Sequence, residues 1–120
     1  MKKSVILAET AVIALEEIKH FKRSAMLRQG HSYEYCSEQA QMFIETLVGR
    51  SISSIADGLV TWGFDVDLAN IGIPVKKYFD KETDYLCFFD DSGPQIAVLY
   101  YTSPRQDYVN ALYRLTTIYQ

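Results

Sequence analysis

The feature that most restricts what this chain can fold into is a pair of strongly apolar runs near its C-terminus. These runs are residues 85–89, Tyr-Leu-Cys-Phe-Phe, and residues 96–101, Ile-Ala-Val-Leu-Tyr-Tyr, with the turn sequence Asp-Asp-Ser-Gly-Pro at residues 90–94 between them. Short runs of aromatic and β-branched residues on either side of a turn predict a β-hairpin. Because both faces of each run are apolar, we expect the two strands to lie in the centre of a sheet.

The N-terminal half predicts one strand followed by two helices. Residues 4–8 form a short β-rich run. For the first helix, Thr10 is a candidate N-cap and Gly30 is a candidate C′ residue. The helically spaced apolar residues of this helix are Ala11, Leu15, Ile18, Phe21 and Ala25. Those of the second helix are Cys36, Ala40, Phe43, Ile44 and Leu47, with Gly49 near the helix end. Because few residues join the two helices, they are expected to form an antiparallel hairpin.

Residues 50–72 are less regular. Residues 51–56 are compatible with one or two further helical turns, and Asp57-Gly58 is a turn signal. Strand character returns from residue 71, where Ile73, Val75 and Phe79 alternate, and an acidic turn over residues 80–84 follows.

The last helix is predicted to begin at Ser103. Pro104 then occupies the first helical position and Gln106 the third, which together give a capping-box pattern. The predicted order of elements is β-α-α-β-β-β-α. We therefore expect one α+β domain over residues 1–120, in which an N-terminal helical hairpin packs on a small, mainly antiparallel sheet with a C-terminal helix.

Composition and charge disfavour several classes of protein. With 48% hydrophobic and 22% charged residues, the chain is globular rather than disordered. Its net charge of −3 disfavours nucleic acid as a direct partner, because such binding relies on basic surfaces. No run approaches the ~20 apolar residues of a membrane span. We expect a soluble cytoplasmic protein that neither enters a membrane nor binds nucleic acid sequence-specifically, with Cys36 and Cys87 as buried reduced thiols.

No residue spacing indicates a metal or cofactor site. His20 and His31 have no Cys or Asp neighbour at ligand spacing. The chain contains neither a Gly-x-Ser-x-Gly elbow nor a glycine-rich phosphate loop. The acidic residues that fall in predicted turns are expected to be solvated; they are Asp80, Glu82, Asp84, Asp90 and Asp91. We expect no cofactor and no metal.

The best candidate site is the junction between the last strand and the last helix, where Arg105, Gln106 and Asp107 stand. The end of a core strand is rigid, and a helix N-terminus is electropositive. Two interpretations stay open, since these residues either serve only to begin the helix or contact a partner or a phosphate. Lys76 and Lys77 are predicted to stand mid-strand on opposite faces, which places one of them on the outer surface or near a cleft.

In the order of its elements and in two local patterns, the chain resembles the RelE/ParE superfamily of toxins from type II toxin–antitoxin modules. Residues 9–18, Glu-Thr-Ala-Val-Ile-Ala-Leu-Glu-Glu-Ile, follow the first strand directly and are similar to the family's x-x-A-x-x-x-L-x-x-I. Residues 85–91 and 95–101, with the following Ser-Pro-Arg105-Gln-Asp107, are similar to the family's paired central strands, which end in a short Arg-x-Asp segment. The likeness covers most of the chain in outline.

The resemblance implies two alternative activities. The RelE type cleaves messenger RNA on the ribosome, whereas the ParE type poisons DNA gyrase, and an antitoxin whose C-terminal segment wraps the toxin neutralises both. This chain is closer to the ParE type, because Leu86 follows the strand residue Tyr85 where many RelE-type relatives carry Arg, and because no His occurs late in the chain. A nuclease would depend on Arg105, with Lys76 or Lys77 and Tyr108.

We therefore expect a toxin that binds an essential target, with DNA gyrase favoured and a cognate antitoxin as partner. The first helix and the hairpin strands are expected to carry the antitoxin groove. The target-binding residues implied are Arg105, Gln106, Asp107, Tyr108, Lys76 and Lys77, and no catalytic residue is assigned. The alternatives are a ribosome-dependent mRNA endonuclease of the RelE type and a non-toxic α+β protein-interaction module.

Overall fold

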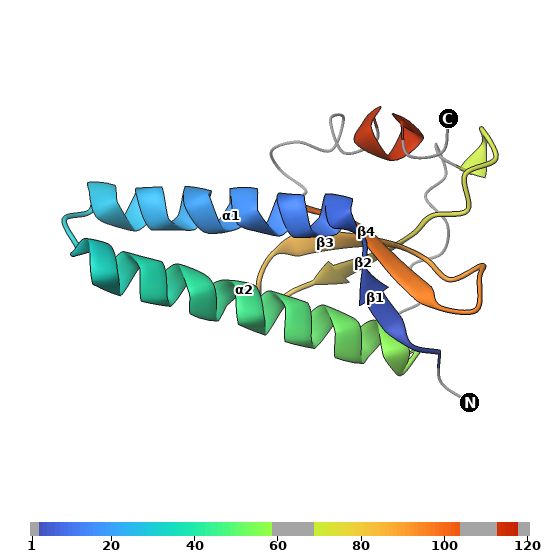
Figure 1. Cartoon of the computed structure of the whole chain (residues 1–120), viewed down its shortest axis with the longest axis horizontal. Helices are drawn as coiled ribbons and strands as arrows, with labels where there is room; N and C mark the ends of the chain where they lie inside the picture. The colour runs from blue at the N-terminus through green and yellow to red at the C-terminus, as the bar shows by residue number, and fades with distance from the viewer. Residues whose placement is uncertain (1–2, 59–68, 104–112, 118–120) are drawn as a thin grey trace.

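A helical hairpin packs on a four-stranded sheet (Figure 1). The computed structural model describes residues 3–58, 69–103 and 113–117. Its elements are β1 (Val5–Leu7), α1 (Glu9–Arg28), α2 (Tyr33–Ala56), β2 (Lys76–Asp80), β3 (Tyr85–Asp90) and β4 (Ile96–Thr102), and residues 113–117 are helical. The predicted α+β class and the predicted order of elements are confirmed, whereas the predicted start of the last helix runs into residues outside the described ranges.

The sheet has the strand order β1-β4-β3-β2. The edge strand β1 pairs with β4 in parallel, whereas the β2–β3 and β3–β4 pairs are antiparallel. Almost every residue of β3 and β4 is buried, because apolar side chains occupy both faces of these strands. The prediction that they are the central strands is therefore confirmed. A register shift between Phe88 and Phe89 interrupts their ladder.

The N-cap of helix α1 lies two residues before Thr10, the N-cap predicted from the sequence. The N-cap is Ala8, which makes no side-chain cap, so this prediction is wrong. The Thr10 hydroxyl instead donates a hydrogen bond to the Leu99 carbonyl of β4, with an O–O distance of 2.6 Å. Gly30 follows the C-cap Gln29 with a φ of 93°, as its predicted C′ position requires.

Helix α2 is longer than its apolar pattern indicates. Ser32 caps its N-terminus by accepting a hydrogen bond from the Tyr35 amide at 3.2 Å. The helix continues through residues 51–56, so Gly49 lies inside the helix and not near its end. Glycine in a helix interior costs about 1 kcal/mol relative to alanine. No neighbour requires it, because a Cβ atom placed there would have nothing within 4 Å.

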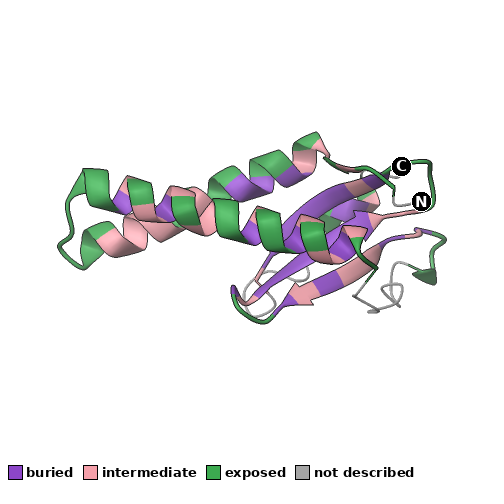
Figure 2. Ribbon diagram, turned by 90° about the horizontal axis from the view of Figure 1, so that it is seen from below, coloured by how far each residue is buried: buried purple, intermediate pink, exposed green. Residues whose placement is uncertain are grey.

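The hairpin extends well beyond the sheet (Figure 2), and the molecule measures 46 × 32 × 23 Å along its principal axes. Close to the sheet, α1 buries Ala11, Ala14, Leu15 and Ile18. Farther from the sheet, its residues are half-buried or exposed. The sequence places Phe21 in the buried stripe of α1. It is 46% exposed, because the sheet covers α1 only up to about this residue.

Asp80 is the most deeply buried charged residue of the described chain. It ends β2 and is 1% exposed, so the prediction that it is a solvated turn residue is wrong. Arg50 Nε donates to both of its carboxylate oxygens, at 2.9 and 3.1 Å. Tyr78 donates its phenol at 3.1 Å, and Thr83 donates its amide and its hydroxyl at 3.2 and 2.5 Å. Burial by itself would raise the pKa of Asp80, but these hydrogen bonds outweigh burial and hold the pKa below its usual value.

Both cysteines are buried free thiols, as predicted. Burial raises the pKa of Cys87 to about 12, so this thiol stays protonated at neutral pH. None of the helices in the described ranges is both long and apolar enough to cross a membrane.

Replacing Asp80 with Asn is expected to lower the free energy of unfolding by about 2 kcal/mol at pH 7, because the buried charge that three side chains bind is lost. Since folding lowers the pKa of Asp80, its stabilising effect is complete above the ordinary value of 3.8 and is lost as the pH falls through the folded-state pKa. The wild-type protein should therefore lose stability below about pH 4 more steeply than Asp80→Asn. Urea unfolding curves across the acidic range measure both effects.

Asp91→Asn is the matched control. The ion pair of Asp91 with Lys76 is partly exposed, so its loss should cost under ~1 kcal/mol. If Asp80→Asn matched the wild type in stability and in pH dependence, Asp80 would not anchor the fold.

Candidate functional site

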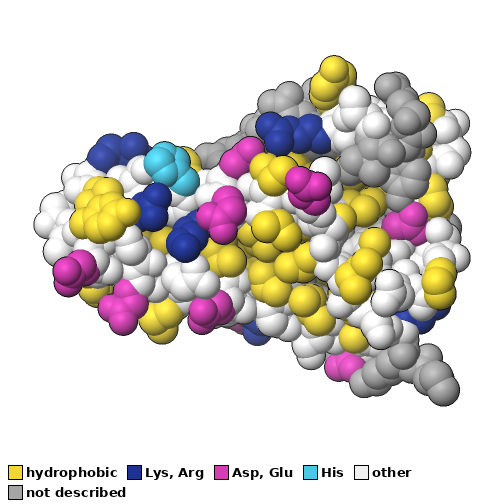
Figure 3. Space-filling view, viewed as in Figure 1, with side chains coloured by type: hydrophobic (Ala, Val, Ile, Leu, Met, Phe, Trp, Pro, Cys, Tyr) yellow, Lys and Arg dark blue, Asp and Glu magenta, His cyan; other side chains and the backbone are white. Residues whose placement is uncertain are grey.

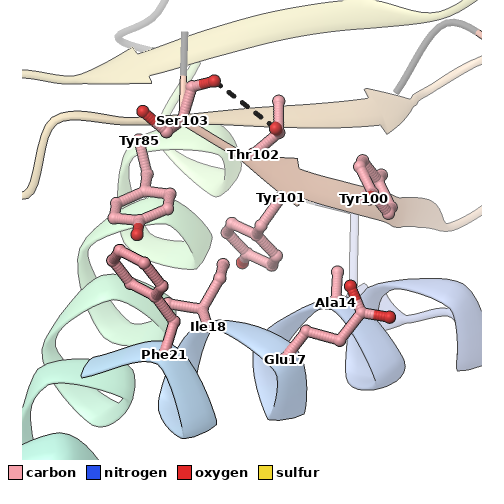
Figure 4. Close-up of a pocket in the computed structure, with 9 residues that line it drawn as sticks. All are labelled: Ala14, Glu17, Ile18, Phe21, Tyr85, Tyr100, Tyr101, Thr102 and Ser103. Carbon is pink, nitrogen blue, oxygen red and sulfur yellow. Dashed lines mark hydrogen bonds between the residues drawn. The ribbon is translucent and has the colours of Figure 1, made fainter. Parts of the chain in front are cut away.

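A pocket of about 210 Å³ opens between α1 and the C-terminal end of β4 (Figure 4). Three segments meet there: one face of α1, the first residue of β3 and the last residues of β4. The lining residues are Ala14, Glu17, Ile18, Phe21, Tyr85, Tyr100, Tyr101, Thr102 and Ser103. The pocket therefore lies at the end of the core strand from which the chain leads on to Arg105.

Helical periodicity and strand register together explain why these residues meet. The four α1 residues have the spacing i, i+3, i+4 and i+7, which puts them on one face of the helix. The Thr10 hydrogen bond to the Leu99 carbonyl fastens the start of α1 along β4. Tyr85 reaches the same place from β3, because the next residue, Leu86, pairs with Thr102.

Aromatic side chains form the mouth of the pocket. Figure 4 shows Phe21 and Tyr85 pointing toward each other across it. Behind Tyr85, the Phe43 ring makes an edge contact with a centroid distance of 5.7 Å. The Lys22 ammonium lies 4.4 Å from the centroid of the Phe43 ring and 5.6 Å from that of Tyr85. This cation–π contact holds a positive charge beside the aromatic mouth.

A buried hydrogen-bond chain supports the back of the pocket. The hydroxyls of Tyr101 and Ser51 lie 2.7 Å apart. Ser51 also lies 2.8 Å from the Leu47 carbonyl, to which its hydroxyl can donate, so the pair joins β4 to the backbone of α2. Burial raises the pKa of Tyr101, and the neighbouring Cys87 raises it further. Burial likewise raises the pKa of Tyr85, with a contribution from Asp84. Both phenols are therefore protonated at neutral pH and cannot act as bases there.

The helix over residues 113–117 contacts the pocket residues Glu17 and Tyr100 with its Arg114 side chain. Its Nη1 atom is 3.5 Å from Glu17 Oε1, and its guanidinium carbon is 5.8 Å from the centroid of the Tyr100 ring. Leu115 is fully buried and anchors this helix. The pocket rim thus carries one carboxylate whose charge Arg114 offsets.

Of the site residues predicted from the sequence, the described ranges contain Lys76 and Lys77. Lys76 and Lys77 open β2 and pair with Phe89 and Phe88, at the opposite end of β3 from Tyr85. Lys76 forms an ion pair with Asp91 at 2.9 Å. Neither lysine lines the pocket. The other predicted site residues are Arg105, Gln106, Asp107 and Tyr108, and they lie outside the described residues.

The sequence predicts an antitoxin groove on the first helix and the hairpin strands, but it does not identify the residues of α1 and α2 that form this pocket. Helical spacing identifies the face that bears Ala14, Ile18 and Phe21. It cannot show that this face meets the end of β4, which depends on pairing between residues about 90 positions apart. Ser51 gave no signal at all, because its partner, Tyr101, is 50 residues away.

Within the described ranges, no group of three or more His, Cys, Asp or Glu residues could hold a metal ion. The residues that line the pocket offer aromatic surface, hydroxyl groups and a paired carboxylate, which suit the binding of a protein or a small molecule. No protein-family model matches the chain, and no curated protein matches it either.

Tyr101→Phe is expected to lower the free energy of unfolding by about 1 kcal/mol, because Ser51 loses a buried partner but keeps its bond to Leu47. Thermal or urea unfolding measures this change. Tyr33→Phe, at a side chain that is 61% exposed, is the matched control and should change stability little. Equal stabilities for the two variants would show that the buried hydroxyl pair contributes nothing.

Proposed function

We propose that this protein is the toxin of a type II toxin–antitoxin pair and that it acts by binding an essential cytoplasmic target, with DNA gyrase favoured. The observation that carries the proposal is the arrangement of the described elements. A helical hairpin follows β1 and covers a sheet of order β1-β4-β3-β2. This agrees with the order of elements on which the resemblance to RelE/ParE toxins depends, and it puts an aromatic pocket where the Ser-Pro-Arg segment begins.

The chemistry of the pocket favours binding over RNA cleavage. Cleavage needs a base for the 2′-hydroxyl, an acid for the leaving oxygen and positive charge on the phosphate. Tyr85 and Tyr101 have raised pKa values and stay protonated. Lys76 and Lys77 lie at the far end of the sheet. At this pocket, these phenols therefore supply no base and these two lysines supply no positive charge for RNA cleavage.

We assign the antitoxin to a second hollow and not to the groove on the first helix and the hairpin strands that the sequence predicts. This second hollow has a volume of about 520 Å³ and lies between the sheet-distal half of the hairpin and the β2–β3 turn. Ala25, Met26, Met42 and Phe43 make it largely apolar, and Met42 is 54% exposed. Figure 3 shows hydrophobic side chains interspersed with charged ones over the hairpin. Methionine-rich surfaces of this kind adapt well to an apolar segment of a partner, and we assign this hollow to the antitoxin.

Inducible expression in bacteria without the antitoxin gene tests the proposal, with growth, plasmid supercoiling and bulk translation followed together. Growth arrest with lost supercoiling and sustained translation is the expected result. Arrest with an early loss of translation would instead support the endonuclease alternative. Unimpeded growth would support the non-toxic interaction module.

Arg105→Ala is expected to abolish growth arrest while leaving antitoxin binding intact, because the target and the antitoxin use different surfaces. Growth curves and co-purification with the antitoxin measure the two properties. Arg28→Ala removes an exposed arginine at the end of α1 and should leave toxicity unchanged. Full toxicity of the Arg105→Ala variant would show that Arg105 does not contact the target.

Phe21→Ala is expected to weaken target binding at least tenfold with little loss of stability, since this ring lines the pocket mouth yet is 46% exposed. Val12→Ala is the matched control, because Val12 is 45% exposed on the same helix and does not line the pocket. Pull-down of the target from lysate, with thermal unfolding of each variant, separates binding from folding. Equal target binding by both variants would exclude the pocket as the contact site.

A further inference from the structure

The buried Asp80 carboxylate binds one edge of the Arg50 guanidinium, and the other edge is exposed to solvent. Both hydrogen bonds to Asp80 use Nε, at 2.9 and 3.1 Å, and among the described residues no hydrogen bond uses the two Nη amino groups. Asp80 is 1% exposed and accepts further bonds from Tyr78 and Thr83, so it is itself firmly placed. The Arg50 side chain is 44% exposed. Its free edge is thus a pre-oriented fork of N–H donors.

A polar hollow of about 330 Å³ adjoins this guanidinium, and Gly49, Arg50, Ser53 and Ser54 line it. The four residues come from two successive turns of one face of α2. The Ser54 hydroxyl lies close enough to the Tyr78 phenol to influence its pKa, which links this wall of the hollow to the Asp80 network. The Ser53 hydroxyl and the guanidinium fork therefore border the same small space, whereas the Ser54 hydroxyl is bonded to Tyr78.

Gly49 points independently to a ligand in this hollow. It lies inside α2, where glycine is unfavourable, and no atom of the described residues would lie within 4 Å of a Cβ atom at this position. Neither packing nor backbone conformation explains it, since its φ is not positive. A missing side chain does keep the hollow beside Arg50 open, as close approach by a ligand requires.

We propose that Gly49, Arg50, Ser53 and Ser54 form a binding site for a small-molecule phosphate monoester. The two Nη groups can bind two phosphate oxygens, and the Ser53 hydroxyl can donate to the third. A carboxylate would satisfy only the fork and leave the Ser53 hydroxyl unused. The hollow has the size of a small-molecule site, and the net charge of −3 disfavours a long polyanion such as RNA. This proposal does not depend on the toxin assignment.

The affinity is expected to be modest, because Asp80 offsets much of the Arg50 charge. Geometry rather than net charge then selects the ligand, so a monoester should bind more tightly than a diester or a carboxylate. Phenyl phosphate, dimethyl phosphate and acetate are suitable probes at matched ionic strength. Chemical shifts of the Arg50 Nε–Hε group and of the α2 amides in the ¹⁵N-labelled protein report binding at the site.

Gly49→Leu is the decisive variant. Leucine is a better helix former than glycine, so the melting temperature should rise, while the new side chain fills the hollow and weakens phenyl phosphate binding at least tenfold. Gln41→Leu, about two turns earlier in α2, is the matched control for the effect of an added leucine and should bind normally. Arg50→Lys keeps the charge but loses the fork, and should weaken binding several-fold.

Three results would overturn the proposal. The first is the absence of saturable shifts with phenyl phosphate. The second is equal binding of phenyl phosphate by Gly49→Leu and the wild type. The third is tighter binding of a single-stranded RNA oligonucleotide than of phenyl phosphate, with a steep salt dependence, which would identify a polyanion surface instead.

Discussion

The parallel pairing of β1 with β4 is the constraint on which the rest of the structure depends. Parallel neighbours need a long crossover connection, and here the connection begins with the helical hairpin. Hydrogen bonds from the Ile96 amide to the Ser4 carbonyl and from the Ala8 amide to the Val98 carbonyl, at 2.8 Å each, close the two ends of this short pairing. The Thr10 bond to Leu99 then directs α1 along β4. The pocket follows from this arrangement, because the face of α1 that bears Phe21 reaches the end of β4.

Two adjacent residues of α2 connect the helix to the sheet in different ways. Ser51 points inward and bonds Tyr101 behind the pocket, whereas Arg50 turns toward Asp80 at the end of β2. A buried charge is costly unless it is fully bound, and the Asp80 carboxylate meets that condition with five hydrogen bonds from three residues. The same contact orients Arg50 toward the polar hollow. One turn of α2 therefore supports both proposed sites.

The two sites differ in chemistry. The pocket beside β4 is aromatic and holds phenols that stay protonated, so it suits recognition of a partner surface. The hollow on α2 is polar and carries a cation with an open edge, so it suits an anion. The hairpin extends past the sheet, and this part of it carries a third, largely apolar surface around Met42.

The elements and their order can be read from the sequence, because apolar periodicity and turn residues act over short distances. Residues 85–89 and 96–101 specified two central strands, and Gly30 specified where α1 ends. Only the tertiary structure decided which polar residues are buried and which faces meet. The sequence assigns Asp80 to a solvated turn. The structure shows that Arg50, 30 positions away, binds its carboxylate. The partners that assemble the pocket are 50 and 89 positions apart, at Ser51–Tyr101 and Thr10–Leu99, and no local pattern encodes contacts over such distances.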